Sequence, residues 1–163
     1  MMTVRELVQN RSVYMIDKNA TVQAAAEFMA VKNIGAVTVM DGSLLVGIFS
    51  ERDVINRVIA KGLRPETTLV SSVMTAELVV ARADETNELC MRKMKQAGCR
   101  HLPVVDGDTL LGVISLRDLL LVDISEKDDK IEFLHNYMFH VQAGAQIKYT
   151  KWPMPGVPQR KDP

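Results

Sequence analysis

A seven-residue motif occurs twice in this chain, and this repeat constrains the fold more than any other feature of the sequence. The stretch at 47–53, GIFSERD, returns 65 residues later at 112–118 as GVISLRD. Glycine, serine, arginine and aspartate keep their register, and eight of the fifteen positions from 39 to 53 are identical in the second copy. An internal repeat of this period predicts two similar supersecondary units.

The composition is that of a globular chain and disfavours several classes of protein. With 163 residues, 47% hydrophobic and 25% charged, the chain can form one compact domain or two small units that share a core. Twenty basic and twenty acidic side chains give a formal net charge of zero, which argues against general nucleic-acid binding. The sequence holds no apolar run of membrane-spanning length, and residues 1–10 lack the apolar core of a signal peptide. We therefore expect a cytoplasmic protein.

Each copy predicts the same order of elements: a strand, a helix, two strands joined by a tight turn, and a second helix. The ranges expected in the first copy are a strand at 12–16, a helix from 21 to 33, strands at 36–40 and 44–49, and a helix from 54 to 61. Those expected in the second copy begin with a strand at 77–81, a helix from 86 to 98, and strands at 102–105 and 110–114. At the same offset the short run 4–8 matches 69–73. The fold class is α/β (α+β), with two β-α-β-β-α repeats.

The first helix of each copy has clear boundary signals. Thr21 and Thr86 stand where an N-cap is expected. Asn33 and Gly98 share one repeat position, and both residue types readily take the left-handed conformation that ends a helix. The apolar face predicted for the first helix consists of Ala24, Ala25, Phe28 and Met29. The second copy has Lys93 at the position of Phe28, so the two helices are not equivalent on this face.

Four segments are expected along the chain: a first unit at 1–65, a second at 66–124, an added helix at 125–142 and an extended tail at 143–163. Ser125 and Asp128 have the spacing of a capping box at the start of the added helix. Five of the eight aromatic residues lie from Phe133 onward, and the tail contains four of the six prolines. The added helix and the tail are therefore candidate surfaces for a partner protein.

The repeated motif has side chains that suit a phosphorylated ribose. A serine at the strand-to-helix junction can offer its hydroxyl to a phosphate, and an aspartate three residues later can accept both ribose hydroxyls. The arginine between them is a planar cation suited to phosphate. The residues with these roles are Ser50, Arg52 and Asp53 in the first copy and Ser115, Arg117 and Asp118 in the second. Ser-x-x-Asp is also a common capping box that requires no ligand, and this alternative stays open.

Together with RHLPVVD at 100–106, these motifs resemble a tandem pair of CBS domains, the regulatory module named after cystathionine β-synthase. The resemblance covers roughly residues 1–124. It implies that the two units pack through their sheets with pseudo-twofold symmetry and leave two clefts. In the family these clefts bind adenosine compounds: AMP, ADP, ATP and sometimes NAD or S-adenosylmethionine. It also implies a homodimer of two pairs.

The resemblance assigns ligand roles residue by residue. It gives the ribose hydroxyls to Asp53 and Asp118, and ribose or phosphate contacts to the neighbouring serines and arginines. Backbone near Tyr14, Ile16, Ala36 and Val37 would line the adenine slot of the first cleft, and backbone at 79–81 with His101 and Leu102 that of the second. Arg100 and His101 are further phosphate candidates; alternatively they are a solvated arginine and a hydrogen-bonded histidine. The family's usual proline is Pro103 in the second copy and a threonine in the first, so we expect the two clefts to differ in affinity.

No pattern in the sequence predicts catalysis or a metal site. Cys90 and Cys99 are nine residues apart, and His101, His135 and His140 have no metal-ligand spacing. A nucleophile elbow and a phosphate-binding P-loop are both lacking. We expect a non-enzymatic regulatory module that binds an adenosine nucleotide and acts on a partner. The alternative is an interaction scaffold whose nucleotide sites are vestigial and whose added helix and tail dock on a target protein.

Overall fold

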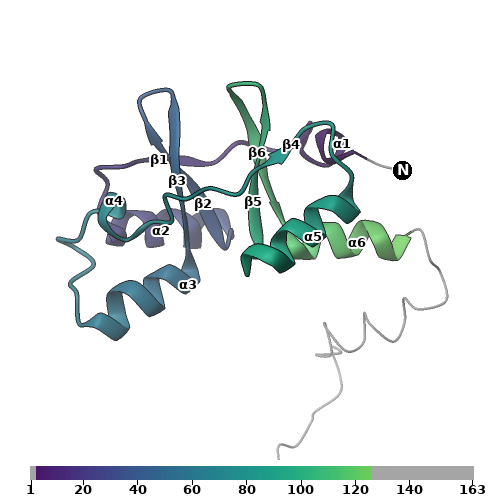
Figure 1. The fold of residues 1–163 in the computed structure, drawn as a ribbon. Coiled ribbons are helices and arrows are strands. Elements are labelled where there is room, and N and C mark those ends of the chain that lie inside the picture. The colour runs from purple at the N-terminus through teal and green to yellow at the C-terminus, as the bar shows by residue number, and fades with distance from the viewer. Residues whose placement is uncertain (1–2, 126–163) are drawn as a thin grey trace, which may run out of the picture. The chain divides into compact units, whose positions relative to one another are not determined.

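The computed structural model describes residues 3–125, which contain both copies of the repeat (Figure 1). The first copy consists of α1 (Val4–Val8), β1 (Met15–Asp17), α2 (Val22–Lys32), β2 (Ala36–Asp41), β3 (Leu44–Ser50) and α3 (Glu51–Asp53), continued by the π-helix η1 (Val54–Val58) and the 3₁₀-helix η2 (Ile59–Lys61). The second copy consists of α4 (Val70–Val73), β4 (Ala81–Arg82), α5 (Asn87–Ala97), β5 (His101–Asp106), β6 (Thr109–Ser115) and α6 (Leu116–Ser125). The added helix and tail predicted beyond 125 lie outside the described residues.

Each copy forms its own three-stranded sheet, in the order β1-β2-β3 and β4-β5-β6. In both sheets the first strand pairs parallel with the second, and the second pairs antiparallel with the third. The two hairpins turn at Gly42 and Gly107, whose φ angles of 59° and 56° favour glycine. The predicted fold class, two β-α-β-β-α repeats, is confirmed.

The helix boundaries follow from the sequence. The side chain of Thr21 accepts a hydrogen bond from the Ala24 amide at 3.1 Å, and Thr86 accepts one from Leu89 at 3.4 Å. Asn33 ends α2 at φ 52°, and Gly98 ends α5 at φ 65°. Both helices therefore begin and end where the capping signals predicted.

The first strand of each sheet is shorter than predicted. The sequence suggested strands at 12–16 and 77–81, but β1 covers Met15–Asp17 and β4 only Ala81–Arg82. β1 is short because it pairs with only three residues of β2, from Thr38 to Met40. Before β1, the carbonyl of Tyr14 accepts a hydrogen bond from the Thr38 hydroxyl at 2.8 Å.

Two expectations about helix faces and ends were wrong. Ala24, predicted to lie on the apolar face of α2, is exposed, whereas Val22 and Ala25 are buried. Ser125, predicted to cap the added helix, is instead the last helical residue of α6. The helical pattern that begins at Leu116 continues through Ser125, so this serine occupies a helical position and not a cap.

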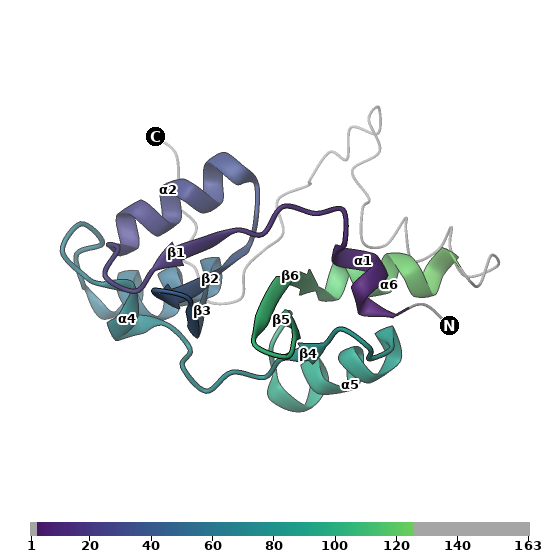
Figure 2. The same ribbon diagram turned by 90° about the horizontal axis from the view of Figure 1, so that it is seen from above.

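The short helices before each sheet are exchanged between the repeats. Val4 and Val8 of α1 are buried in the second core, with Ala81, Leu102 and Ile114 among their neighbours. Val70 and Val73 of α4 are buried in the first core, with Val37, Val39 and Phe49. Figures 1 and 2 both show α1 beside the second repeat. Each core is therefore closed by a helix that belongs, in sequence order, to the other repeat.

The exchange also corrects the register of the two short helices. The Val4 amide donates to the Glu85 carbonyl at 2.9 Å, and the Val70 amide donates to the Ala20 carbonyl at 2.9 Å. Glu85 and Ala20 are 65 residues apart, but Val4 and Val70 are 66 apart. The match of 4–8 with 69–73 is thus displaced by one residue. Each short helix packs on the sheet of the other repeat. A difference of one residue in its connection to the sheet that follows it in the chain therefore does not shift the strand pairing of that sheet.

Candidate ligand-binding site

The duplicated serine and aspartate form the same closed turn at the end of the last strand of each sheet. In the first repeat the Ser50 amide and hydroxyl both donate to Asp53 Oδ2 at 2.8 Å, and the Asp53 amide donates back to Ser50 Oγ at 3.4 Å. In the second repeat the corresponding distances between Ser115 and Asp118 are 2.7, 2.6 and 3.2 Å. The capping alternative therefore describes a real feature of both turns. A second use of the same carboxylates by a ligand is compatible with it, because the cap engages only Oδ2 of each aspartate.

The antiparallel hairpins bring the start of the middle strand beside these turns. Ala36 pairs with Ser50, and His101 pairs with Ser115. The Glu51 amide donates to the Gly35 carbonyl at 3.1 Å, and the Leu116 amide to the Arg100 carbonyl at 2.8 Å. In each repeat the predicted residues of the middle strand and those of the turn, which are distant in sequence, therefore lie at one end of the sheet.

Each aspartate is also paired with an arginine that sequence reasoning missed. In the first repeat Arg57 Nε lies 3.3 Å from Asp53 Oδ1, and its Nη1 donates to the Val73 carbonyl at 2.8 Å. In the second repeat Arg11 Nη1 lies 2.8 Å from Asp118 Oδ1. The i,i+4 spacing of Asp53 and Arg57 was a usable signal. No local signal links Arg11 to Asp118, since they come from opposite ends of the described chain.

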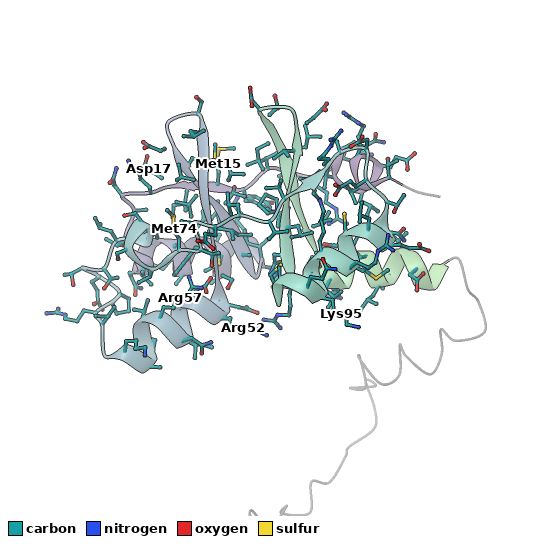
Figure 3. The ribbon with its side chains drawn as sticks, viewed as in Figure 1. Met15, Asp17, Arg52, Arg57, Met74 and Lys95 are labelled. Atoms are coloured by element: carbon teal, nitrogen blue, oxygen red, sulfur yellow. The ribbon has the colours of Figure 1, made fainter. Side chains whose placement is uncertain are left out.

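Figure 3 labels Arg57, which lies on the helical segment that follows β3. Arg57 lies in η1, where the helix changes from α to π hydrogen bonding. Insertions of this kind occur often at functional sites. The helix after the second turn, α6, is described as α-helical throughout. The two repeats thus differ in the helix that follows an otherwise equivalent turn.

The carboxyl group of Asp118 is held in its charged form. Burial raises its pKa, but the hydrogen bonds from the Ser115 hydroxyl and amide, together with Arg11, outweigh burial and leave the pKa below its ordinary value. At neutral pH the group is an acceptor with one oxygen engaged by the cap and the other by a cation. A charged carboxylate of this kind can accept further hydrogen bonds from hydroxyl donors.

His101 meets the first repeat at Gly35. A Cβ added to Gly35 would lie 3.3 Å from His101 Nε2 and 3.5 Å from Glu51 Oε1, so the missing side chain leaves room for the imidazole. Burial lowers the pKa of His101, and the charges of Arg100 and Arg52 lower it further, whereas Glu51 and Asp118 oppose this effect. The imidazole is therefore mainly neutral at neutral pH. It lies among charged groups from both repeats.

The remaining predicted residues divide into core and surface positions. Val37 and Leu102 are fully buried in the two cores, and Ala36 and Pro103 are also buried. Ile16 is partly buried against the first core. These five can offer a ligand backbone atoms, as expected for an adenine slot, more readily than side chains. Arg52, Arg100 and Arg117 are exposed.

The two predicted adenine slots differ in their surroundings. In the first repeat the rings of Tyr14 and Phe28 pack edge to face with centroids 6.0 Å apart. In the second repeat Lys93, at the position of Phe28, donates to the Val80 carbonyl at 2.9 Å and to both oxygens of Glu85 at 2.7 and 2.6 Å. An aromatic contact has been replaced by a half-buried ion pair. The second slot is consequently more polar.

Within residues 3–125 there is no cluster of histidine, cysteine, aspartate or glutamate that could hold a metal ion. Cys90 is buried, and burial together with the charge of Glu85 raises the pKa of its thiol to about 11. The same part of the chain has no helix long and apolar enough to cross a membrane. A shallow surface hollow on α5, which includes Lys95 (Figure 3), contains none of the predicted ligand residues.

Comparison with known sequences identifies the repeat. Residues 4–60 and 70–125 each match the sequence model of the CBS domain family. The CBS domain-containing protein YhcV of Bacillus subtilis is 36% identical over 115 residues, which cover 71% of this chain and 81% of that protein. CBSCBSPB2, a CBS domain-containing protein of Arabidopsis thaliana, is 37% identical over 131 residues. Those residues are 80% of this chain but only 24% of the Arabidopsis protein.

Solved structures share the fold. The CBS-domain containing protein ATU1752 of Agrobacterium tumefaciens superimposes with a TM-score of 0.70 at 30% identity, covering 76% of this chain and 100% of that one. A hexameric CBS-CP12 protein of bloom-forming cyanobacteria gives 0.67 at 31% identity, covering 80% and 74%. The CBS domain pair of MJ0100, solved with 5-methylthioadenosine and S-adenosyl-L-methionine, gives 0.70 at 21% identity, covering 78% and 99%. At that identity the MJ0100 likeness concerns the fold alone.

Proposed function

Because the chain belongs to the CBS domain family and carries two of its domains, we propose that it is a regulatory module that binds an adenosine compound. Binding alters its affinity for a partner or its own conformation, and the module performs no catalysis of its own. The ligand occupies the turns at Ser50–Asp53 and Ser115–Asp118. The proposed cytoplasmic location stays a prediction.

The observation that carries this proposal is the duplicated carboxylate with one oxygen held by its cap. In both repeats Oδ2 receives the serine amide and hydroxyl, which fixes the orientation of the carboxylate. The other oxygen, Oδ1, faces a partly exposed arginine. An oriented, charged acceptor beside a cation suits the hydroxyls and the phosphate of a nucleotide.

Regulation would follow from differential affinity. A ligand shifts an equilibrium between two conformations only as far as its affinities for them differ. The close approach of His101 to Gly35 could respond to such a difference, because Gly35 precedes the strand beside the first turn and His101 begins the strand beside the second. A nucleotide bound at either turn would bring the negative charge of its phosphate close to His101 and so change the electrostatic environment of the imidazole.

A thermal-shift titration with AMP, ATP, NAD and S-adenosylmethionine tests the proposal. A ligand that binds only the folded state stabilises it by about 2.7 kcal/mol at a hundredfold excess over Kd. We expect at least one compound to raise the melting temperature, and Asp118→Ala or Asp53→Ala to reduce that shift while the protein stays folded. If nucleotide-free protein shows no shift with any of the four compounds, ligand sensing is refuted and the scaffold function is favoured.

A role in protein association is a second candidate, favoured by exposed apolar residues after the first turn. Ile55, Ile59 and Leu63 are 59%, 57% and 44% exposed and follow one another at intervals of four residues. Such a row suits contact with a second copy of the chain, and the predicted homodimer would cover it. The hexameric CBS-CP12 protein shows that a protein of this fold can assemble.

Light scattering coupled to gel filtration tests the association. We expect Ile55→Lys to weaken the dimer, whereas Val31→Lys, at a residue 81% exposed on α2, should leave it intact. A monomeric wild-type protein would contradict the homodimer. Docking on a target protein through the predicted tail is tested separately by deleting 143–163, which should abolish partner capture without changing nucleotide binding.

A further inference from the structure

Arg11 lies between α1 and β1 of the first copy but reaches the ligand-binding turn of the second. It follows α1, whose Val4 and Val8 are buried in the second core. The amide of Arg11 donates to the Val8 carbonyl at 2.9 Å, which fixes the chain just beyond the helix. From there Nη1 of the guanidinium lies 2.8 Å from Asp118 Oδ1. The exchange of the short helices therefore delivers a cation to the second turn from outside that repeat.

The corresponding cation of the first repeat is held differently. The guanidinium of Arg57 is bonded at two points, through Nε to Asp53 Oδ1 and through Nη1 to the Val73 carbonyl. These contacts fasten η1 to the end of α4 and restrict the reorientation of the guanidinium. The side chains of Arg11 and Arg57 are equally exposed, at 43%, but the contact of Arg11 with Asp118 is through one terminal nitrogen, Nη1. An arginine has five N–H donors in a planar fork, so a guanidinium bound by one nitrogen can still accept an anion on another edge.

The charges around the two turns reinforce this difference. His101 and Arg100 stand at the start of β5, next to the second turn, whereas the first repeat has Ala36 and Gly35 at these positions. His101 pairs with Ser115 in the sheet, so the start of β5 lies beside this turn. The second turn thus has Arg11 at Asp118, and His101 and Arg100 at the adjacent start of β5.

We propose that Arg11 is a specificity-determining residue of the second repeat, which makes this repeat prefer adenosine compounds that carry a phosphate over uncharged adenosine. This inference rests on the proposed function. Ribose hydroxyls donate to Asp118 Oδ1, and Arg11 turns a free edge of its guanidinium to the phosphate while it keeps contact with the carboxylate. The first repeat, with Arg57 fastened at two points, discriminates less between charged and uncharged ligands.

The test is an NMR titration of the full chain with adenosine, AMP and ADP. The amides of Gly112 and Ser115 report binding at the second repeat, and those of Gly47 and Ser50 report binding at the first. Arg11→Gln should weaken AMP and ADP at the second repeat about tenfold, as expected for the loss of one charge-assisted hydrogen bond from a partly exposed cation. Its adenosine affinity should change less than twofold, and the first repeat should be unaffected.

Arg5→Gln is the matched control. Arg5 lies on α1, the helix that Arg11 follows, is also about half exposed, and pairs with Asp106 at 2.7 Å. If both variants lost AMP affinity equally, the loss would result from the change in net charge and not from a contact of Arg11 with the phosphate, which would overturn the proposal. Equal losses for adenosine and AMP in Arg11→Gln would show that Arg11 only positions Asp118, which also overturns it. The spectra themselves report whether each variant is folded.

The proposal can fail separately from nucleotide binding. If no adenosine compound shifts any reporter amide in the wild type, the proposed function is refuted. A titration with pyrophosphate, followed by the side-chain Nε–Hε signal of Arg11, then decides whether the arginine binds phosphate groups. A shift at Arg11 that is saturable and absent at Arg5 supports the anion-binding role, and the lack of such a shift overturns it.

Discussion

Because the short helices α1 and α4 are exchanged, we predict that a substitution in either one destabilises the repeat that lies farther from it in the sequence. Val4 and Val70 are both fully buried, and each lies in the core of the repeat that does not follow it in the chain. Valine to alanine removes the equivalent of two methylene groups, worth about 0.8 kcal/mol each, and the remaining cavity adds to this loss. We therefore expect Val4→Ala to destabilise the second repeat by roughly 2 kcal/mol, and Val70→Ala to destabilise the first by a similar amount.

Native-state hydrogen exchange resolves the two effects because it reports stability segment by segment. A loss of about 2 kcal/mol corresponds to roughly thirtyfold faster exchange of the amides that open with the affected core. Val4→Ala should accelerate exchange mainly in β5 and β6, and Val70→Ala mainly in β2 and β3. Preferential acceleration of β2 and β3 by Val4→Ala would refute the exchange, since α1 would then support the repeat that it precedes. Equal acceleration in both sheets would refute the assignment of each helix to one core.

Three further predictions follow from single residues. Because the folded pKa of Asp118 lies below its unfolded value of about 3.9, its carboxylate stabilises the fold above that pH and loses this contribution as the pH falls through the folded pKa. Denaturation at pH 7 and pH 3 should therefore show a smaller acid effect in Asp118→Asn, and an unchanged pH dependence would contradict this. Gly47→Ala should cost about 1–3 kcal/mol in urea unfolding, because the new Cβ would overlap Met74 Sδ and lie 3.1 Å from the Thr75 carbonyl; a neutral result would refute that packing. Cys90 should resist thiol reagents at pH 8 in the native state, and rapid labelling would contradict its burial and raised pKa.

The candidate site shows which kinds of contact sequence reasoning can find. Ser50, Asp53, Ser115 and Asp118 were predicted because their spacing is local and repeated, and a reciprocal cap requires only three residues of separation. Arg11 was missed because its contact with Asp118 depends on where α1 packs, which no local pattern encodes. The ligand roles of the predicted residues stay predictions that the binding experiments test.

Local chemistry in the sequence determined the repeat, the order of elements, the hairpin turns and the left-handed ends of α2 and α5. These features depend on backbone preferences and caps within a few residues, so a pattern of residue types is sufficient to specify them. Only the tertiary structure decided which core each short helix closes, where the ladders of β1 and β4 begin, and which arginine meets each aspartate. Burial and ion pairing between distant segments depend on the arrangement of all the packed elements, and two apolar stretches as similar as 4–8 and 70–73 carry no information on which sheet will cover them.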